Sequence, residues 1–211
     1  MNPLLYTNRT AWHLRLTRAL LVQEALQVPG SIVECGVRDG AGVLLYSHCI
    51  DIFDPLGIDR RVIGLDTFSG FPSVGEHDPE TSAVGDVAST ISFEDLSDWA
   101  SFAEENRVIS SSRRSELIRG DGADSIPGFV AARPELVISM LVLDFDLYEP
   151  TRVALEHLLP RIPKGGIIVF DELASQKWHG ETVAVNEALG IANLRLRRHT
   201  SDAHTCSAVV G

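Results

Sequence analysis

Five short runs rich in Val, Ile and Leu constrain the fold of this 211-residue chain more than any other feature. They are nearly continuous rather than alternating: SIVECG (31–36), RVIGLD (61–66), SELIRG (115–120), LVISMLVLD (136–144) and GIIVFD (166–171). A strand with one wet face alternates apolar and polar side chains, whereas a continuous apolar strand is buried on both faces. The pattern therefore predicts a parallel sheet covered by helices.

Segments with helical spacing separate these runs. They are WHLRLTRALLVQEAL, GVLLYSHCIDIF, FEDLSDWASFAEEN, EPTRVALEHLLPRI and ETVAVNEALG, the last ended by Gly190. In the third segment Phe93, Leu96, Trp99 and Phe102 recur at about three-residue intervals and predict one apolar face. The alternation of strand and helix predicts an open, doubly wound α/β sheet with helices on both faces.

The C-terminal residues predict two further strands. LRLRRHT (194–200) and SAVVG (207–211) flank a polar turn at Ser201 and Asp202, which is typical of a hairpin. We therefore expect a mostly parallel, seven-stranded sheet with an antiparallel C-terminal strand.

Composition limits the classes of function. The formal net charge is −11, which disfavours nucleic-acid or acidic-membrane partners because either would need a basic face. Three cysteines make no disulfide framework, and no apolar run approaches the ~20 residues that span a bilayer. We expect a cytoplasmic protein with one domain over 1–211, beginning with a helical segment over 1–30.

A glycine-rich turn follows the first predicted strand. ECGVRDGAG contains Glu34, Gly36, Gly40 and Gly42. Glycines at a strand-to-helix turn let the backbone approach a ligand, and an acid two residues before the first glycine suits S-adenosylmethionine. The alternative is an ordinary tight turn.

Acids also follow the second and third strands. Asp66, followed by Thr67, stands where nucleotide-binding sheets place the acid that accepts the ribose hydroxyls. Asp121 is placed to reach an adenine amino group. The alternatives are a capping or turn role for Asp66 and a helix cap at Asp124 or Ser125.

Four carboxylates follow the fourth and fifth strands. Asp144 and Asp146 stand in LVLDFDLYEP, and Asp171 and Glu172 stand in VFDE. Neighbouring strand ends lie about 5 Å apart, so these acids could converge, and they could then all ionise only beside a cation. Oxygen ligands of this kind suit Mg²⁺, Mn²⁺ or Ca²⁺. The alternative is that each acid caps the helix that follows it.

Taken together, the motifs between Ser31 and about Gly190 resemble the macrocin-type sugar O-methyltransferases. The motifs that carry the resemblance are VECGVRDGAG, DTFSGFP, LDFDLYEPT, ALEHLLPRIPKGGIIVFDE and HGETVAVNEAL. These methyltransferases are class I, Rossmann-like enzymes that use S-adenosylmethionine and Mg²⁺. The resemblance implies that Asp144, Asp171 and Glu172 bind Mg²⁺, with Asp144 as general base and Asp146 behind it. It implies cofactor contacts from Glu34, Gly36, Gly40, Asp66, Thr67, Asp121 and Asp144.

The chain departs from the family pattern at three points. It has Asp171–Glu172 where the family usually has two aspartates, and Asp121 where the family often has an aromatic residue. The region before Ser31 is shorter than in relatives. These departures affect the metal geometry, the adenine contact and the acceptor pocket, respectively.

The resemblance implies methyl transfer to a hydroxyl of a deoxysugar or another vicinal diol, by a homodimer or larger homo-oligomer. The polar segment 68–92 could be a lid over this acceptor or a disordered loop. His179 could contact the acceptor or act as a second base, or be a surface histidine. Trp178 could stack on a sugar or pack under the lid.

Two other classes of function stay open. The Asp-x-Asp at 144–146 also suits a glycosyltransferase that binds a nucleotide sugar through Mn²⁺. A non-catalytic methyltransferase-like binding subunit is the other alternative.

Overall fold

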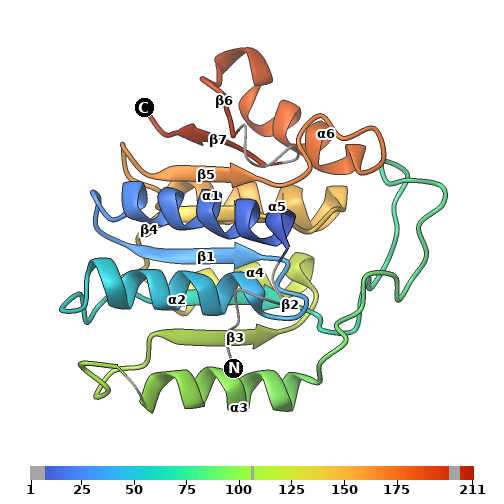
Figure 1. Ribbon diagram of the computed structural model, residues 1–211. Helices are drawn as coiled ribbons and strands as arrows, with labels where there is room; N and C mark the ends of the chain where they lie inside the picture. The colour runs from blue at the N-terminus through green and yellow to red at the C-terminus, as the bar shows by residue number, and fades with distance from the viewer. Residues whose placement is uncertain (1–7, 106, 200–204) are drawn as a thin grey trace.

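The computed structural model describes residues 8–105, 107–199 and 205–211. Its sheet has seven strands in the order β3-β2-β1-β4-β5-β7-β6 (Figure 1). The strands are β1 (Ser31–Cys35), β2 (Val62–Asp66), β3 (Ser115–Arg119), β4 (Ile138–Leu143), β5 (Ile167–Phe170), β6 (Arg197–Arg198) and β7 (Cys206–Val209). Strands β1 to β5 pair in parallel, and β7 is antiparallel to both of its neighbours. The predicted sheet is confirmed.

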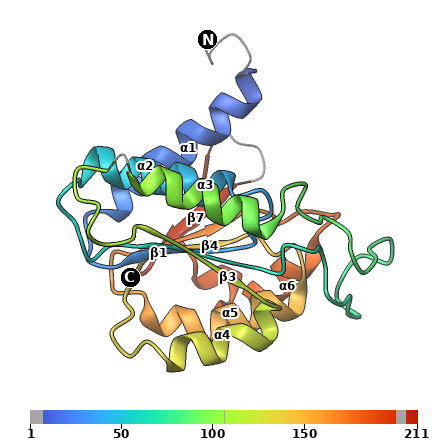
Figure 2. The same cartoon turned by 90° about the horizontal axis from the view of Figure 1, so that it is seen from below.

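Within the described residues, six α-helices cover the two faces of the sheet (Figure 2). On one face lie α1 (Arg9–Ala25), α2 (Ala41–Phe53) and α3 (Phe93–Glu105). On the other lie α4 (Gly122–Ala131), α5 (Tyr148–Leu158) and α6 (His179–Leu189), with 3₁₀ turns at Leu159–Arg161 and Ile191–Asn193. Strands β1 and β4 are buried along their whole length, as continuous apolar runs require. Two apolar clusters, one on each face, form the core.

The predicted apolar face of α3 is wrong in part. Leu96 and Ala100 are the residues that α3 buries, whereas Trp99 and Phe102 are 62% and 61% exposed. The reason is that α3 lies beside β3, the edge strand, so it contacts the sheet through a narrow stripe. The structure also contains α4, before β4, which is absent from the helical segments named from the sequence.

The two final strands are confirmed, although β6 is only two residues long. The turn predicted at Ser201 and Asp202 lies outside the described residues. Among the described residues, no helix combines the length and the apolar content that crossing a membrane requires.

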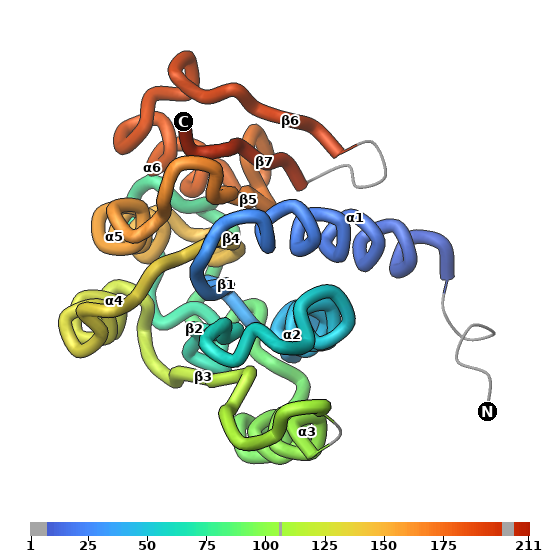
Figure 3. Tube along the Cα trace, turned by 90° about the vertical axis from the view of Figure 1, so that its left-hand side faces the viewer, coloured from blue at the N-terminus to red at the C-terminus, as the bar shows by residue number. Residues whose placement is uncertain are grey.

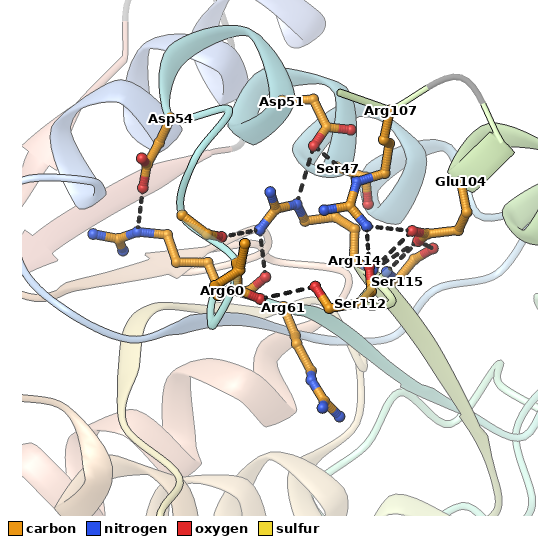
Figure 4. Close-up of polar contacts among 12 residues, drawn as sticks. Ser47, Asp51, Asp54, Arg60, Arg61, Glu104, Arg107, Ser112, Arg114 and Ser115 are labelled. Carbon is orange, nitrogen blue, oxygen red and sulfur yellow. Dashed lines mark hydrogen bonds and ion pairs between the residues drawn. The ribbon is translucent and has the colours of Figure 1, made fainter. Parts of the chain in front are cut away.

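A buried arginine pair fastens α2, α3 and β3 together at the end of the sheet where the parallel strands begin (Figure 4). Arg114, whose side chain is fully buried, and Arg107 both donate to Oδ1 of Asp51, at 3.2 and 3.1 Å. Glu104 accepts from the backbone N–H groups of Arg114 and Ser115. This network accounts for charged residues in an otherwise apolar layer.

Helix α1 extends beyond the layer that α2 and α3 form (Figures 2 and 3). Its C-terminal half is buried through Thr17, Arg18, Leu21, Val22 and Ala25, while Trp12, Leu16 and Leu20 are 45%, 55% and 57% exposed. The buried half of α1 brings one charged side chain, Arg18, to the ends of the central strands.

Candidate functional site

A cavity of about 600 Å³ lies at the carboxyl ends of the central strands. The strand order reverses between β1 and β4, and open α/β sheets bind ligands at such a point. Eleven of the residues singled out from the sequence line it: Glu34, Gly36, Gly42, Asp66, Thr67, Asp121, Asp144, Asp146, Asp171, Glu172 and Trp178. Gly40 and His179 are not among the lining residues, and His179 is exposed at the start of α6.

The glycine-rich turn brings the ends of β1 and β4 together. Gly36 has φ +93°, and a Cβ on it would lie 1.9 Å from the carbonyl oxygen of Asp144. A Cβ on Gly42 would lie 1.8 Å from Oε1 of Glu34. Only glycine fits at either position. Gly40 has a different role: it precedes α2 with φ +76°, and a Cβ there would meet Leu96 of α3.

Asp66 fastens that turn from the neighbouring strand. Its Oδ2 accepts from the backbone N–H groups of Val37 and Arg38 at 2.7 and 2.8 Å, and its Oδ1 accepts from Phe68 N–H at 2.6 Å. Oδ2 thus uses both of its lone pairs, and the acceptor capacity that remains is at Oδ1, whose other contact is the long one of 3.5 Å from the Thr67 hydroxyl. Asp66 therefore orders the turn and lines the cavity at once.

Asp121 caps α4. Its side chain accepts from Ala123 N–H at 2.9 Å, and it also lines the cavity. The alternative interpretation placed this cap at Asp124 or Ser125, and that is wrong: both residues lie inside the helix.

Asp144 and Asp171 come together from the ends of β4 and β5, held by Arg18. The guanidinium NH2 lies 3.3 Å from Oδ2 of Asp144 and 2.8 Å from Oδ1 of Asp171. Its NH1 lies 3.4 Å from Oε1 of Glu34 and 3.1 Å from the Tyr46 hydroxyl. One buried cation thus contacts acids from three neighbouring strand ends.

Negative charge at these strand ends exceeds what Arg18 offsets. Burial and then the charge of Asp171 raise the pKa of Asp144 well above its usual range. Burial, followed by the charges of Glu172 and Asp171, raises the pKa of Asp146 to about 7. Burial raises the pKa of Glu34 to about 8, although Arg18 opposes it. Such shifts arise when carboxylates share a cleft and lack water.

A further acid, Glu181 of α6, lies beneath this group. Its side chain is fully buried, and its Oε1 accepts from Glu172 N–H at 3.3 Å. Its Oε2 and the Oε2 of Glu34 have no hydrogen-bond partner among the described residues. Burial and the charge of Asp171 raise the pKa of Glu181 well above its usual range.

The donor set has the chemistry of a site for a hard cation, since it offers carboxylate oxygens and surplus negative charge. Within the described ranges, no three His, Cys, Asp or Glu side chains are gathered closely enough to hold a metal as they stand. Two of the three predicted ligands, Asp144 and Asp171, instead contact Arg18.

The segment 68–92 runs from β2 along the side of the molecule to α5 and α6 (Figure 1). Asp78 accepts from Tyr148 N–H at 2.7 Å, and Phe71 packs edge-on against Trp178 with ring centroids 5.7 Å apart. Lys177 lies over the Trp178 ring, and Phe71, Lys177 and Trp178 line the cavity. Four residues of the segment, Gly70, Phe71, Pro72 and Val87, thus line one wall of the cavity.

The loops after four of the central strands also contain strained backbone. Arg38, Phe68, Asp146 and Ala174 all have positive φ, between 50° and 69°. Non-glycine residues rarely adopt this conformation, and it clusters at binding sites because the surrounding structure must enforce it. These strained residues lie at the carboxyl ends of the strands, which is the edge of the sheet where the cavity lies.

Sequence reasoning missed several residues of the site, above all Arg18, Tyr46 and Glu181. Arg18 had a usable signal, since it stands directly before the apolar stretch ALLV (19–22) of α1, where an unpaired charge would be costly if it were buried. Tyr46 and Glu181 had none, because each looks like an ordinary helical residue until the packing is known.

Comparisons with known proteins agree with this geometry. A family model described as Macrocin-O-methyltransferase (TylF) matches residues 12–188. A Streptomyces olivaceus tetracenomycin-pathway 4'-O-methyltransferase is 29% identical over 149 residues, covering 70% of this chain and 54% of that protein. Demethyldecarbamoylnovobiocin O-methyltransferase of Streptomyces niveus is also 29% identical, with 69% and 53% covered. This chain therefore spans about half the length of these curated relatives.

Solved structures resemble the whole chain. The crystal structure of CalS11, a calicheamicin methyltransferase, has a TM-score of 0.94 and 31% identity, covering all of this chain and 83% of that one. Its apo structure, described as a TDP-rhamnose 3'-O-methyltransferase, has a TM-score of 0.86 with 30% identity, covering 100% and 84%. The O-methyltransferase NovP, at 22% identity and a TM-score of 0.71, shares the fold.

Proposed function

Because this chain belongs to the macrocin O-methyltransferase family, we propose that it transfers a methyl group from S-adenosylmethionine to a hydroxyl group of a deoxysugar, free or within a natural product. The observation that carries the proposal is the cavity itself. It has the glycine turn and Asp66 on one side, and Asp144 and Asp171 on the other. A cofactor site and a group of acids thus share one space.

The names of the relatives support the sugar acceptor. The tetracenomycin relative acts on a rhamnosyl group, and CalS11 is described as acting on TDP-rhamnose. The aromatic pair Phe71 and Trp178 supports the same class, since aromatic faces pack against the apolar faces of sugar rings. The identity of the acceptor is part of the proposal.

The cofactor would lie along the turn after β1. Gly36 and Gly42 keep the backbone open there, and Asp66 would offer Oδ1 to the ribose hydroxyls. Asp121 faces the same cavity from the start of α4, where an adenine amino group could donate to it. Glu34 lies beneath the turn, where Arg18 contacts its Oε1.

In the proposed reaction the acceptor oxygen attacks the methyl carbon of the sulfonium. A carbon–oxygen bond forms, the carbon–sulfur bond breaks, and its electron pair stays on sulfur, giving S-adenosylhomocysteine. Asp144 takes the hydroxyl proton, with Asp146 behind it as the second acid. The enzyme contributes mainly alignment, because the sulfonium is already electrophilic.

We include Mg²⁺ in the proposal, with Asp144, Asp171 and Glu172 as the residues that would hold it. When bound, Mg²⁺ would lower the pKa of the acceptor hydroxyl and fix a vicinal diol. The chemistry of the donors and their surplus negative charge support this role. His179 remains a proposed acceptor contact only at the rim, since it is exposed beside Trp178.

The test is calorimetric titration with S-adenosylhomocysteine, with and without Mg²⁺, followed by a methyl-transfer assay on TDP-rhamnose and glycosylated acceptors. We expect binding at micromolar ligand and a product heavier by one methylene. No binding at millimolar ligand sinks the methyltransferase assignment. Binding without transfer to any sugar would favour the non-catalytic alternative, and binding of a nucleoside diphosphate alone would favour the glycosyltransferase.

A further inference from the structure

Arg18 joins the two halves of the cavity. Its NH1 donates to Glu34 and Tyr46, under the turn that faces the proposed cofactor. Its NH2 donates to Asp144 and Asp171, the acids on the side of the proposed acceptor.

The NH1 end of this guanidinium is the fixed end. Glu34 and Tyr46 are 2% and 0% exposed, whereas the side chains of Asp144 and Asp171 are 26% and 20% exposed. A guanidinium is planar and rigid, so anchoring one nitrogen in the core sets the direction of the other. Glu34 and Tyr46, which lie under the turn that faces the proposed cofactor, therefore set the orientation of Asp144 and Asp171 through Arg18.

The contact also settles which carboxylate oxygens are used. Arg18 contacts Oδ2 of Asp144 and Oδ1 of Asp171, and Thr205 donates to the same Oδ1 at 3.2 Å. The other oxygen of each aspartate is left out of these contacts. Two carboxylates at adjacent strand ends repel each other, and the guanidinium of Arg18 between them reduces that repulsion.

Resting on the proposed function, we propose that Arg18 is a positioning residue of the active site, fixed by Glu34 and Tyr46 and holding Asp144 and Asp171 in place for proton transfer. Helix α1 is then a part of the site and not only an N-terminal extension. Its contribution differs from that of Leu14, which lines the cavity without contacting the acids.

The experiment replaces the guanidinium and then returns it in solution. Arg18→Ala removes the group, and about 30 mM guanidinium chloride supplies it again. Urea is the neutral control of the same shape, and sodium chloride is the control for ionic strength. The matched variant is Arg15→Ala, because Arg15 is exposed on the same helix and, among the described residues, its guanidinium donates to Ala11 within that helix.

We measure thermal unfolding and S-adenosylhomocysteine affinity for wild type and both variants in each solution. Arg18→Ala should unfold on the order of 10 °C lower than wild type, since it leaves buried acids without their cation. It should bind the ligand at least about tenfold more weakly, because the turn loses its anchor. Guanidinium chloride should restore much of the unfolding temperature and of the ligand affinity of Arg18→Ala, whereas urea and sodium chloride should not. It should have no such effect on wild type or on Arg15→Ala. Turnover, where present, should follow the same order.

Loss of guanidinium-specific rescue, or equal behaviour of the two variants, overturns the proposal. If Arg18→Ala does not fold, Arg18→Lys decides: a Lys cannot span both groups, so undiminished ligand affinity in it also overturns the proposal. The unfolding measurement needs no methyl transfer. Rescue without any transfer therefore leaves the role of Arg18 standing while the proposed function fails.

Discussion

Asp78 accepts a hydrogen bond of 2.7 Å from the backbone N–H of Tyr148, the first residue of α5. Asp78 is buried although it stands in the most polar part of the chain, and it also accepts from Gly75 N–H at 2.7 Å. Asp78, a residue of the segment 68–92, therefore caps the N-terminus of α5. This single side chain ties the wall of the cavity to the helix that follows Asp144 and Asp146.

Asp78→Ala should loosen that wall. We expect a loss of about 1–2 kcal/mol in the free energy of unfolding, the usual effect of removing a helix cap. We also expect a higher KM for the sugar acceptor than for S-adenosylmethionine, because the wall lies over the acceptor side. Urea unfolding and hydrogen exchange over 70–90 measure the first effect, and steady-state kinetics the second.

Asp86→Ala is the control, since the Asp86 side chain accepts only from Ala83 within the same segment. It should leave acceptor KM unchanged. Equal KM changes in the two variants would count against a closing role for the segment.

Gly36→Ala should disrupt the meeting of β1 and β4. A methyl group would lie 1.9 Å from the carbonyl oxygen of Asp144, and the positive φ of Gly36 adds backbone strain. We expect a loss of several kcal/mol or failure to fold, about 2–4 kcal/mol being typical of overpacking plus strain. The control is Gly128→Ala in α4, where no atom lies within 4 Å, and it should be neutral or stabilising. Chemical unfolding compares them, and equal losses would contradict the close approach.

Arg114→Met should destabilise the protein far more than Arg61→Met. Arg114 is fully buried and donates to Asp51 and two backbone carbonyls, whereas the Arg61 side chain is 52% exposed. Breaking a buried pair costs about 3 kcal/mol and losing an exposed one less than about 1 kcal/mol. Urea midpoints measure the difference. If the two variants unfold alike, the buried network contributes no more than a surface pair.

The strand ends were predictable because the parallel sheet imposes a common edge. Once β1, β2, β4 and β5 were recognised as buried runs, Glu34, Asp66, Asp144 and Asp171 had to lie at one edge. That inference needs only the polarity of parallel strands and no contact between particular side chains. The apolar pattern therefore predicted which acids would share a cavity.

What the sequence could not predict depends on packing between elements far apart in the chain. Gly40 stands in the same turn as Gly36, yet its missing Cβ makes room for Leu96 of α3. Trp99 and Phe102 have the spacing of a buried face, but the edge position of α3 exposes them. Arg18 reaches Asp171 across 153 residues of chain, and only the placement of α1 shows this.

Metal removal should separate the roles of Asp144 and Asp171. We expect EDTA to reduce methyl transfer by about 100-fold or more while leaving S-adenosylhomocysteine affinity within about threefold. Asp144→Asn should abolish turnover, since it removes both the base and a proposed metal ligand, and should spare cofactor affinity. Added Mg²⁺ should partly restore Asp171→Asn alone. A turnover rate unaffected by EDTA would remove the metal from the mechanism.

The cofactor-free protein should lose stability as pH rises. Burial raises the folded pKa of Asp146 from 3.8 to about 7, and that of Glu34 from 4.5 to about 8. Below about pH 4 both groups are protonated in the folded and unfolded states alike. Between about pH 4 and 8 the folded state keeps protons that the unfolded state has released, so the free energy of unfolding falls. Above that window the loss is complete.

Asp146→Asn should flatten this decline between about pH 4 and 7, because the amide does not titrate. One proton is worth up to about 1.4 kcal/mol per pH unit, so urea unfolding at half-unit intervals resolves the change. Asp98→Asn is the control, since Asp98 is exposed on α3, and it should leave the slope as it is. Stability that rises with pH through this window, or equal slopes in the two variants, would mean that Asp146 is ionised in the folded state. Asp146 would then be a charged group beside a cation and not a protonated acid.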